Sequence, residues 1–371
     1  MPKLQALQSL RAIAASLVVL NHAIGVVAGH GFAKEPYSGL ADFAGAQGVA
    51  IFFLISGFIM TYTADTVDDS EAPHLRALHF ATRRIARVVP LYWVFTLLVA
   101  AVAALAGFSK ALDTNALNLL RSLFFIPYVN AQGVMLPVLP IGWTLNYEMF
   151  FYAVFATSLL LPHRHRIFAL IGTLTLLVVT GCFFYPVLAG NLPHSVGALL
   201  THPILLLFGV GTALGKLRLA RPEWTLSIPG IPLVAPLIAV NGYLFYTAHE
   251  IPLRMQWYAL FWIVDLGIVA LCVYGRALAM PRLEALGDAS YSLYLVHILP
   301  LFLCFLAWKA VHFVAPVAFI GACLAVSSVT AIASFRWLER PLTRAALRAI
   351  TRPKPPVAAP EPAVISALQE V

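Results

Sequence analysis

Long uninterrupted runs of apolar residues follow one another along almost the whole chain. A helix rises about 1.5 Å per residue, so roughly 20 apolar residues cross the hydrocarbon core of a bilayer. The pattern predicts ten membrane-spanning helices, at residues 10–28, 48–63, 89–107, 142–161, 167–185, 196–215, 228–247, 256–274, 291–311 and 314–335. A shorter apolar run at residues 116–127 predicts an interfacial or re-entrant helix.

The composition supports a membrane protein over other classes. Hydrophobic residues occupy 61% and charged residues 11% of the 371 positions, which excludes an ordinary soluble enzyme and a disordered chain. Because the apolar runs are continuous rather than alternating, the predicted fold is all-α, a polytopic membrane helix bundle. We assign residues 1–348 to this membrane domain and expect the Pro/Ala-rich residues 349–371 to be a disordered cytoplasmic tail.

The placement of the basic residues predicts the orientation. The chain has 24 Lys and Arg and a net charge of +8. With a cytoplasmic N-terminus, 19 of the 24 fall on the cytoplasmic side and 5 on the other, as the positive-inside rule requires. Both termini are therefore predicted to be cytoplasmic, and nucleic acid is not needed to explain the charge. The four cysteines lie in apolar runs without metal-ligand spacing, so we expect no metal site.

Four ionisable side chains interrupt the predicted spans, where such groups are costly and mark function by default. They are His22, Glu148, Asp265 and His297. Arg11 and His22 are 11 residues apart, about three helical turns plus 20°, so both face one side of the first helix, about 16.5 Å apart. Taken singly, Arg11 would be a charge anchor and His22 a packing residue. The pattern identifies no partner for Asp265.

Glu148 belongs to a polar stripe on the fourth predicted helix, in which Thr144, Glu148 and Tyr152 are spaced four residues apart. It lies about 9 Å below the outer face of the membrane, roughly the depth of His22. If the two helices pack together, these side chains meet, and a carboxylate that fixes an imidazole tautomer makes a general base. The alternative is a structural Glu148 paired with another buried donor.

A basic cluster precedes the third predicted helix. Arg84 and Arg87 are three residues apart, so they lie side by side at the cytoplasmic surface of the membrane. Two guanidinium groups in this arrangement suit a phosphorylated ligand. Binding of lipid headgroups and a purely topological role are the alternatives.

A second polar cluster lies in the ninth predicted helix. His297 follows Ser290, Tyr291 and Tyr294 at helical spacing, about 10 Å above the cytoplasmic face. These side chains either line a substrate pathway or form hydrogen bonds between helices.

Several segments, in their order along the chain, resemble a known family. They are QSLRAIAASLVVLNHA, GVAIFFLISGFIMTY, RRIARVVPLYW, SLFFIPY, IGWTLNYEMFFY, GDASYSLYLVH and FRWLERPLTRAALR. From about residue 7 to residue 348 the chain resembles the acyltransferase-3 family of integral membrane acyltransferases. Within that family it is most similar to the exopolysaccharide-acetylating branch.

The resemblance implies a ten-helix bundle in the bacterial cytoplasmic (inner) membrane with both termini cytoplasmic. It also implies an acyl-CoA donor and a sugar hydroxyl as acceptor. His22 matches the catalytic base of the family's Arg-ten-residues-His pattern, which begins at Arg11. Arg84 and Arg87 match an Arg-x-x-Arg pattern expected, like Arg11, on the donor side. Glu148 matches the family's carboxylate.

We therefore expect His22, oriented by Glu148, to take a proton from the acceptor hydroxyl, which attacks the thioester. An acyl-His22 intermediate is an alternative route. Candidate oxyanion stabilisers are Asn21, Ser56 and Asn146. The site residues expected to line the pathway or support it are Asn21, Ser56, Trp143, Asn146, Tyr152, Tyr291, Tyr294 and His297.

The expected co-substrate is acetyl-CoA or another acyl-CoA, with no permanently bound cofactor. Expected partners are a lipid-linked or polymeric carbohydrate acceptor, membrane lipids, and a polysaccharide export complex or a second copy of the chain. A proton-coupled transporter or flippase of a polysaccharide precursor is the alternative function. A scaffold subunit of an export complex is another. Against a transporter, the first five and last five predicted helices show no repeat.

Overall fold

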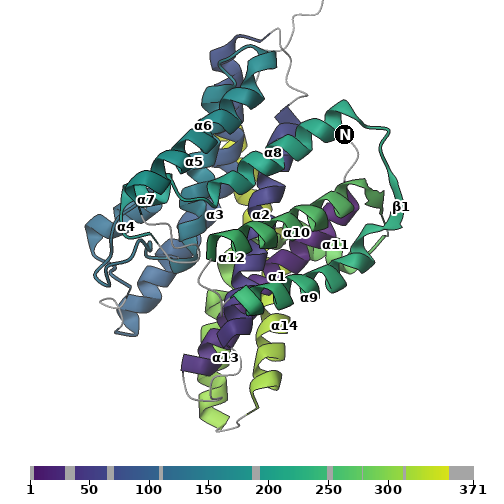
Figure 1. The fold of residues 1–371 in the computed structure, drawn as a ribbon. Helices are drawn as coiled ribbons and strands as arrows, with labels where there is room; N and C mark the ends of the chain where they lie inside the picture. Colours follow the sequence, from purple (N-terminus) through teal and green to yellow (C-terminus); the bar gives the residue numbers. More distant parts are fainter. Residues whose placement is uncertain are drawn as a thin grey trace, which may run out of the picture.

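The computed structural model describes residues 4–29, 38–64, 71–107, 112–185, 193–248, 254–277, 279–311 and 315–350. Most of these residues are helical (Figure 1). Across the described ranges there is a single small sheet, in which β1 (Leu226–Pro229) and β2 (Gly275–Arg276) pair in parallel. The predicted all-α bundle is confirmed.

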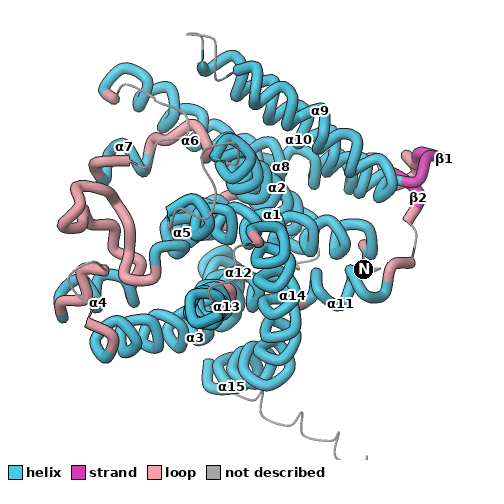
Figure 2. The backbone as a smooth tube through the Cα atoms, turned by 90° about the horizontal axis from the view of Figure 1, so that it is seen from below, coloured by secondary structure: helices cyan, strands magenta, loops and turns pink. Residues whose placement is uncertain are grey.

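The bundle is built around its first helix. The first half of the chain contributes α1 (Gln5–Gly29), α2 (Ser38–Ala64), α3 (Pro73–Leu105), α4 (Ala116–Leu123), the 3-10 turn η1 (Pro140–Gly142), α5 (Trp143–Ser158) and α6 (His163–Phe184). The second half contributes α7 (Val196–Leu200), α8 (Leu205–Ala220), α9 (Gly230–Ala248), α10 (Arg254–Tyr274), α11 (Pro281–Asp288), α12 (Ser290–Val296), α13 (Ile298–Val311), α14 (Pro316–Ser334), the π-helical turn η2 (Phe335–Glu339) and α15 (Arg340–Ile350). Figure 2 shows α1 near the middle of the bundle, where it contacts α2, α11, α12 and α14.

Every predicted span coincides with a helix or a pair of helices. Seven of the described helices are long and apolar enough to cross a membrane, and α12 with α13 makes an eighth if this bent pair is one span. The apolar part of α10, Ala259–Tyr274, and the 16-residue α5 are shorter. The chain is therefore a multi-pass membrane protein, while the number ten and the cytoplasmic placement of both termini stay predictions.

The predicted start of the third span at residue 89 is too late for the helix that contains it. α3 begins at Pro73 and runs to Leu105, so Arg84 and Arg87 lie within a helix rather than before one. The sequence pattern did not reveal that one helix begins at Pro73, because its first turns are polar and hydropathy marks only the apolar part of a helix.

The ninth predicted span is broken rather than straight. α12 and α13 meet at His297 with a bend of 49°. Pro300, buried near the start of α13, explains the bend: it lacks the backbone N–H that would bond the carbonyl of Val296, and its ring clashes with that carbonyl.

The last predicted span ends too early at residue 335. The helix continues through η2 and α15 to Ile350, and α15 packs against α3. Only the first two residues of the predicted tail, 349 and 350, fall in the described range, and they complete this helix. Residues 351–371 lie outside the part that the structure describes.

Two glycines allow α2 and α8 to pack with their backbones in contact. A Cβ atom at Gly57 would lie 2.1 Å from the backbone oxygen of Phe208, and one at Gly211 would lie 2.1 Å from that of Leu54. Small residues permit this close approach between helices in a membrane. The aromatic ring of Phe208 then stacks on Phe53 and Phe151, which ties α8 to α2 and α5.

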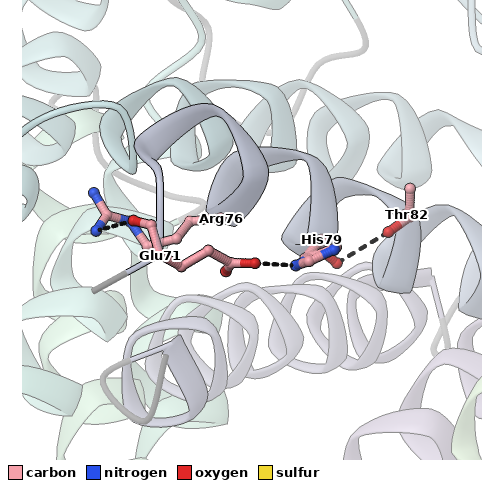
Figure 3. A network of polar contacts seen from close by, with 4 residues as sticks. All are labelled: Glu71, Arg76, His79 and Thr82. Atoms are coloured by element: carbon pink, nitrogen blue, oxygen red, sulfur yellow. Dashed lines mark hydrogen bonds and ion pairs between the residues drawn. The ribbon is translucent and has the colours of Figure 1, made fainter. Parts of the chain in front are cut away.

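A polar network fixes the start of α3, the helix that carries Arg84 and Arg87. Glu71 forms an ion pair with Nδ1 of His79 at 2.8 Å, and Arg76 donates to the backbone oxygen of Glu71 at 3.1 Å (Figure 3). Arg76 also donates to the backbone oxygen of Leu159 at 3.3 Å, just after the end of α5. These contacts hold α3 and α5 at a fixed distance on one side of the bundle.

Candidate active site

A cavity between α1, α2, α3, α5 and α12 gathers most of the predicted site residues. It contains about 790 Å³ of space not filled by atoms, part of which is open solvent. Eight of the thirteen predicted residues line it, namely Arg11, Ser56, Arg84, Arg87, Glu148, Tyr152, Tyr291 and Tyr294. The other lining groups are Thr144, Ser290 and apolar side chains, mainly of α2.

Three arginines from two helices meet at this cavity. Arg11 donates to Oε1 of Gln8 at 3.1 Å. Arg84 donates to Oγ1 of Thr63 at 3.3 Å, and its guanidinium lies 5.4 Å from the centre of the Phe80 ring. Arg87 repels both other guanidinium groups electrostatically. Because a bound anion would relieve the repulsion between Arg87 and the other two guanidinium groups, this arrangement suits an anionic ligand.

Glu148 lies in the same cavity with two hydroxyl partners. It accepts hydrogen bonds from Tyr152, one turn later on α5, and from Oγ of Ser56 on α2 at 3.4 Å. All three residues of the polar stripe, Thr144, Glu148 and Tyr152, line the cavity. The carboxylate also acts electrostatically on Arg11 and Arg84, so it partly offsets the arginine charge.

The expected pairing of His22 with Glu148 is wrong. Nδ1 of His22 lies 2.9 Å from the backbone oxygen of Val18 and 3.3 Å from Nε2 of His297. The two imidazole centres are 5.0 Å apart. The reason is helix packing: α1 contacts α2, α11, α12 and α14, whereas α5 packs mainly on α3 and α6. Equal depth in the membrane did not make these two helices neighbours.

The histidine pair adjoins the cavity through Tyr294. The ring of Tyr294 lines the cavity and lies 6.3 Å from the ring of His297, centre to centre. Its hydroxyl donates to the backbone oxygen of Ile141 at 2.7 Å and lies 2.6 Å from Oγ1 of Thr144. Tyr294 therefore connects the lining of the cavity to His297, and its hydroxyl is held by η1 and α5.

The remaining predicted residues lie away from the lining of the cavity. Asn21 packs its amide against Gly45 of α2, where a Cβ atom would lie 2.4 Å from Nδ2. Trp143 packs edge-on against Tyr147 with ring centres 5.9 Å apart, and Asn146 is buried. The structure thus does not bring these three residues together with the arginines.

Glu339 is a buried carboxylate that the sequence pattern did not single out. It lies in the π-helical turn η2, is 6% exposed, and accepts a hydrogen bond from Oγ of Ser292 at 2.6 Å. Arg87 and Arg11 are the cations that act on it. The signal was present, because Glu339 is the one acidic residue in FRWLERPLTRAALR, but it lay beyond the predicted end of the last span.

Asp265 has two partners that hydropathy could not identify. It accepts hydrogen bonds from Gln47 of α2 and Asn241 of α9, and all three side chains are fully buried. Neither amide residue is ionisable, so neither interrupts an apolar run as a charge does. This cluster is separate from the residues that line the cavity. Within the described ranges, no group of three or more His, Cys, Asp or Glu side chains could hold a metal ion.

Comparison with known proteins now decides the family. The profile of an acyltransferase domain matches residues 4–335, nearly the whole chain. The chain belongs to this acyltransferase family. The acyltransferase is also similar to the exopolysaccharide production protein ExoZ of Rhizobium meliloti (strain 1021), with 37% identity over 312 residues, covering 81% of this chain and 90% of that protein. No solved structure matches the acyltransferase.

Proposed function

We propose that this acyltransferase moves an acetyl or another short acyl group from cytoplasmic acyl-CoA to a hydroxyl of a cell-surface or exopolysaccharide sugar. The observation that carries the proposal is the cavity in which Arg11, Arg84 and Arg87 converge inside a membrane helix bundle. Similarity to a protein named for exopolysaccharide production supports the class of acceptor. The site lies in the bacterial cytoplasmic membrane, with the arginines toward the cytoplasm.

The arginines bind the phosphates of the donor in this proposal. Guanidinium groups form paired hydrogen bonds with phosphate oxygens and keep their charge at any physiological pH. Arg84 and Arg87 come from one face of α3, and Arg11 approaches from α1. Since Arg11 and His22 are separated by about 16.5 Å of helix rise, the pantetheine arm of the donor spans the distance to the base.

His22 is the general base. Its Nε2 takes the proton of the acceptor hydroxyl while the hydroxyl oxygen forms a bond to the thioester carbon. The bond from that carbon to sulfur then breaks, and the proton passes from His22 to the departing thiolate. General-base catalysis of this kind contributes about 10²- to 10⁴-fold in rate.

Ser56 is the best placed of the three candidate oxyanion stabilisers. It lines the cavity, whereas Asn21 and Asn146 do not. Its 3.4 Å contact with Glu148 is long for a bond between a hydroxyl and a carboxylate, so its hydrogen can turn toward a developing oxyanion.

The test is transfer of a radiolabelled acetyl group from acetyl-CoA to a lipid-linked or polymeric sugar by the purified protein in lipid nanodiscs. The parent should transfer label, and His22→Ala should lose at least 99% of the rate. His74→Ala is the matched control, because His74 is exposed on α3. Equal transfer by His22→Ala would refute the general-base role. Transport of a sugar precursor without any use of acetyl-CoA would instead support the transporter alternative.

A further inference from the structure

We infer that His297 is a positioning residue for the proposed acyl transfer, which fixes the imidazole of His22 and stabilises the charge that His22 acquires. The inference rests on the proposed function, because it assigns a partner to the proposed base. It replaces the carboxylate partner expected from the sequence with a second, neutral imidazole on another helix.

The hydrogen positions in the pair follow from the two backbone carbonyls. A carbonyl oxygen only accepts, so Nδ1 of His22, 2.9 Å from the oxygen of Val18, carries a hydrogen. Nδ1 of His297 lies 3.1 Å from the oxygen of Leu293 and carries a hydrogen for the same reason. In the neutral ring of His297, Nε2 is therefore an acceptor, and it lies 3.3 Å from Nδ1 of His22.

This arrangement leaves one nitrogen of His22 free for chemistry. Because the one hydrogen on Nδ1 of His22 is shared between the backbone oxygen of Val18 and Nε2 of His297, the lone pair of the neutral ring lies on Nε2. The tautomer is thus the one a general base needs, and two acceptors on one side of the ring enforce it. No carboxylate of the described residues makes a hydrogen bond to either imidazole.

His297 also suits the charge that develops during the reaction. When Nε2 of His22 takes a proton, the ring becomes a cation and Nδ1 becomes a stronger donor, and charge-assisted hydrogen bonds are roughly twice as strong as neutral ones. The acceptor on His297 meets that stronger donor. A neutral partner does so without a permanent charge in the membrane, which a carboxylate would bring.

The position of His297 is fixed by its surroundings. The residue is 0% exposed and lies at the 49° bend between α12 and α13. On the cavity side it packs against Tyr294, whose hydroxyl is tied to Ile141 and Thr144. His297 itself neither gains nor loses a proton: the proton moves from the acceptor hydroxyl to His22 and then to the thiolate.

The first experiment compares two variants of His297 in the acetyl-transfer assay. His297→Leu removes the acceptor while filling the space, and His297→Gln supplies a carbonyl oxygen as a replacement acceptor. We expect His297→Leu to lower kcat about tenfold or more with an unchanged KM for acetyl-CoA, and His297→Gln to regain most of that loss. His74→Leu, at an exposed site, should match the parent. Full kcat in His297→Leu, or equal loss in both folded variants, would overturn the inference.

The second experiment needs no turnover. NMR of the protein labelled with ¹⁵N-histidine should show a correlation between ring nitrogens across the N–H···N bond, which disappears in His22→Gln and in His297→Leu. Its absence in the parent would overturn the pairing whatever the activity. A parent that shows the correlation but transfers no acetyl group would refute the proposed function and leave the paired imidazoles standing.

Discussion

Gln47 of α2 donates a buried hydrogen bond to Asp265 of α10, although 218 positions separate them in the chain. Asn241 of α9 donates to the same carboxylate oxygen at 3.1 Å and lies 2.9 Å from Oε1 of Gln47, to which it also donates. Three helices are therefore joined inside the bundle by one polar cluster. The other carboxylate oxygen of Asp265 and the amide oxygen of Asn241 make no hydrogen bond within the described part of the chain.

This cluster predicts different effects for two substitutions of Asp265. Asp265→Leu leaves the buried amide nitrogen of Gln47 without its acceptor, whereas Asn241 still donates to Gln47 and to the backbone oxygen of Phe261, and the change should lower the free energy of unfolding by about 1–3 kcal/mol. Asp265→Asn keeps an oxygen acceptor for Gln47 and Asn241 and cannot ionise, so it should unfold at the parent temperature or above. Thermal unfolding in nanodiscs measures both. A similar loss of stability in the two variants would show that the charge itself is needed.

The contact between α2 and α8 predicts that Gly57 tolerates no side chain. The Cβ atom of Gly57→Ala would lie 2.1 Å from the backbone oxygen of Phe208, so the helices must separate, at a cost of about 1–3 kcal/mol. Gly321→Ala is the control, since a Cβ atom at that position of α14 meets nothing within 4 Å. It should stabilise the protein by roughly 0.5–1 kcal/mol through helix propensity. Equal melting temperatures for the two variants would contradict the described packing.

Replacing arginine by lysine separates donor binding from membrane topology. The double change Arg84→Lys, Arg87→Lys keeps both positive charges, so insertion and orientation should be unchanged. It removes the planar guanidinium forks, so calorimetry should show acetyl-CoA binding weakened about tenfold. The control is Arg83→Lys, because Arg83 is exposed and is not among the residues that line the cavity. Unchanged affinity for acetyl-CoA in the double variant would indicate that Arg84 and Arg87 serve only membrane topology.

Removing the charge of Glu339 is expected to change the affinity for acetyl-CoA in the opposite direction. It offsets part of the charge of Arg11 and Arg87, so Glu339→Gln should strengthen binding of acetyl-CoA roughly twofold to tenfold at low salt. Ser292→Ala removes the hydrogen bond to Glu339 but not its charge and should leave the affinity unchanged. If both variants changed the affinity alike, local packing rather than charge would be responsible.

Sequence patterns predicted the components of the site better than their connections. Helical spacing placed Thr144, Glu148 and Tyr152 on one face, and all three line one cavity. Spacing also gives the depth of a residue along its own helix, and that is why His22 and Glu148 were expected to meet. Depth does not specify which helices are neighbours. In the structure α1 packs on α12, whereas α5 packs mainly on α3 and α6.

Partners of buried polar groups were hidden for a second reason. A charged residue stands out in an apolar run, whereas the amides Gln47 and Asn241 do not, so the partners of Asp265 became visible only in three dimensions. The broken helix at His297 was equally hidden. Pro300 lies in a run whose hydropathy is uninterrupted, and hydropathy carries no information on backbone hydrogen bonds.

The walls of the cavity come from both ends of the chain, since Arg11 belongs to α1 and Tyr294 to α12. A ribosome that synthesises this protein delivers α1 to the membrane long before residues 290–296 leave the exit tunnel. No nascent chain that ends before α12 can enclose the cavity. Synthesis itself thereby delays completion of the cavity until α12 has been inserted.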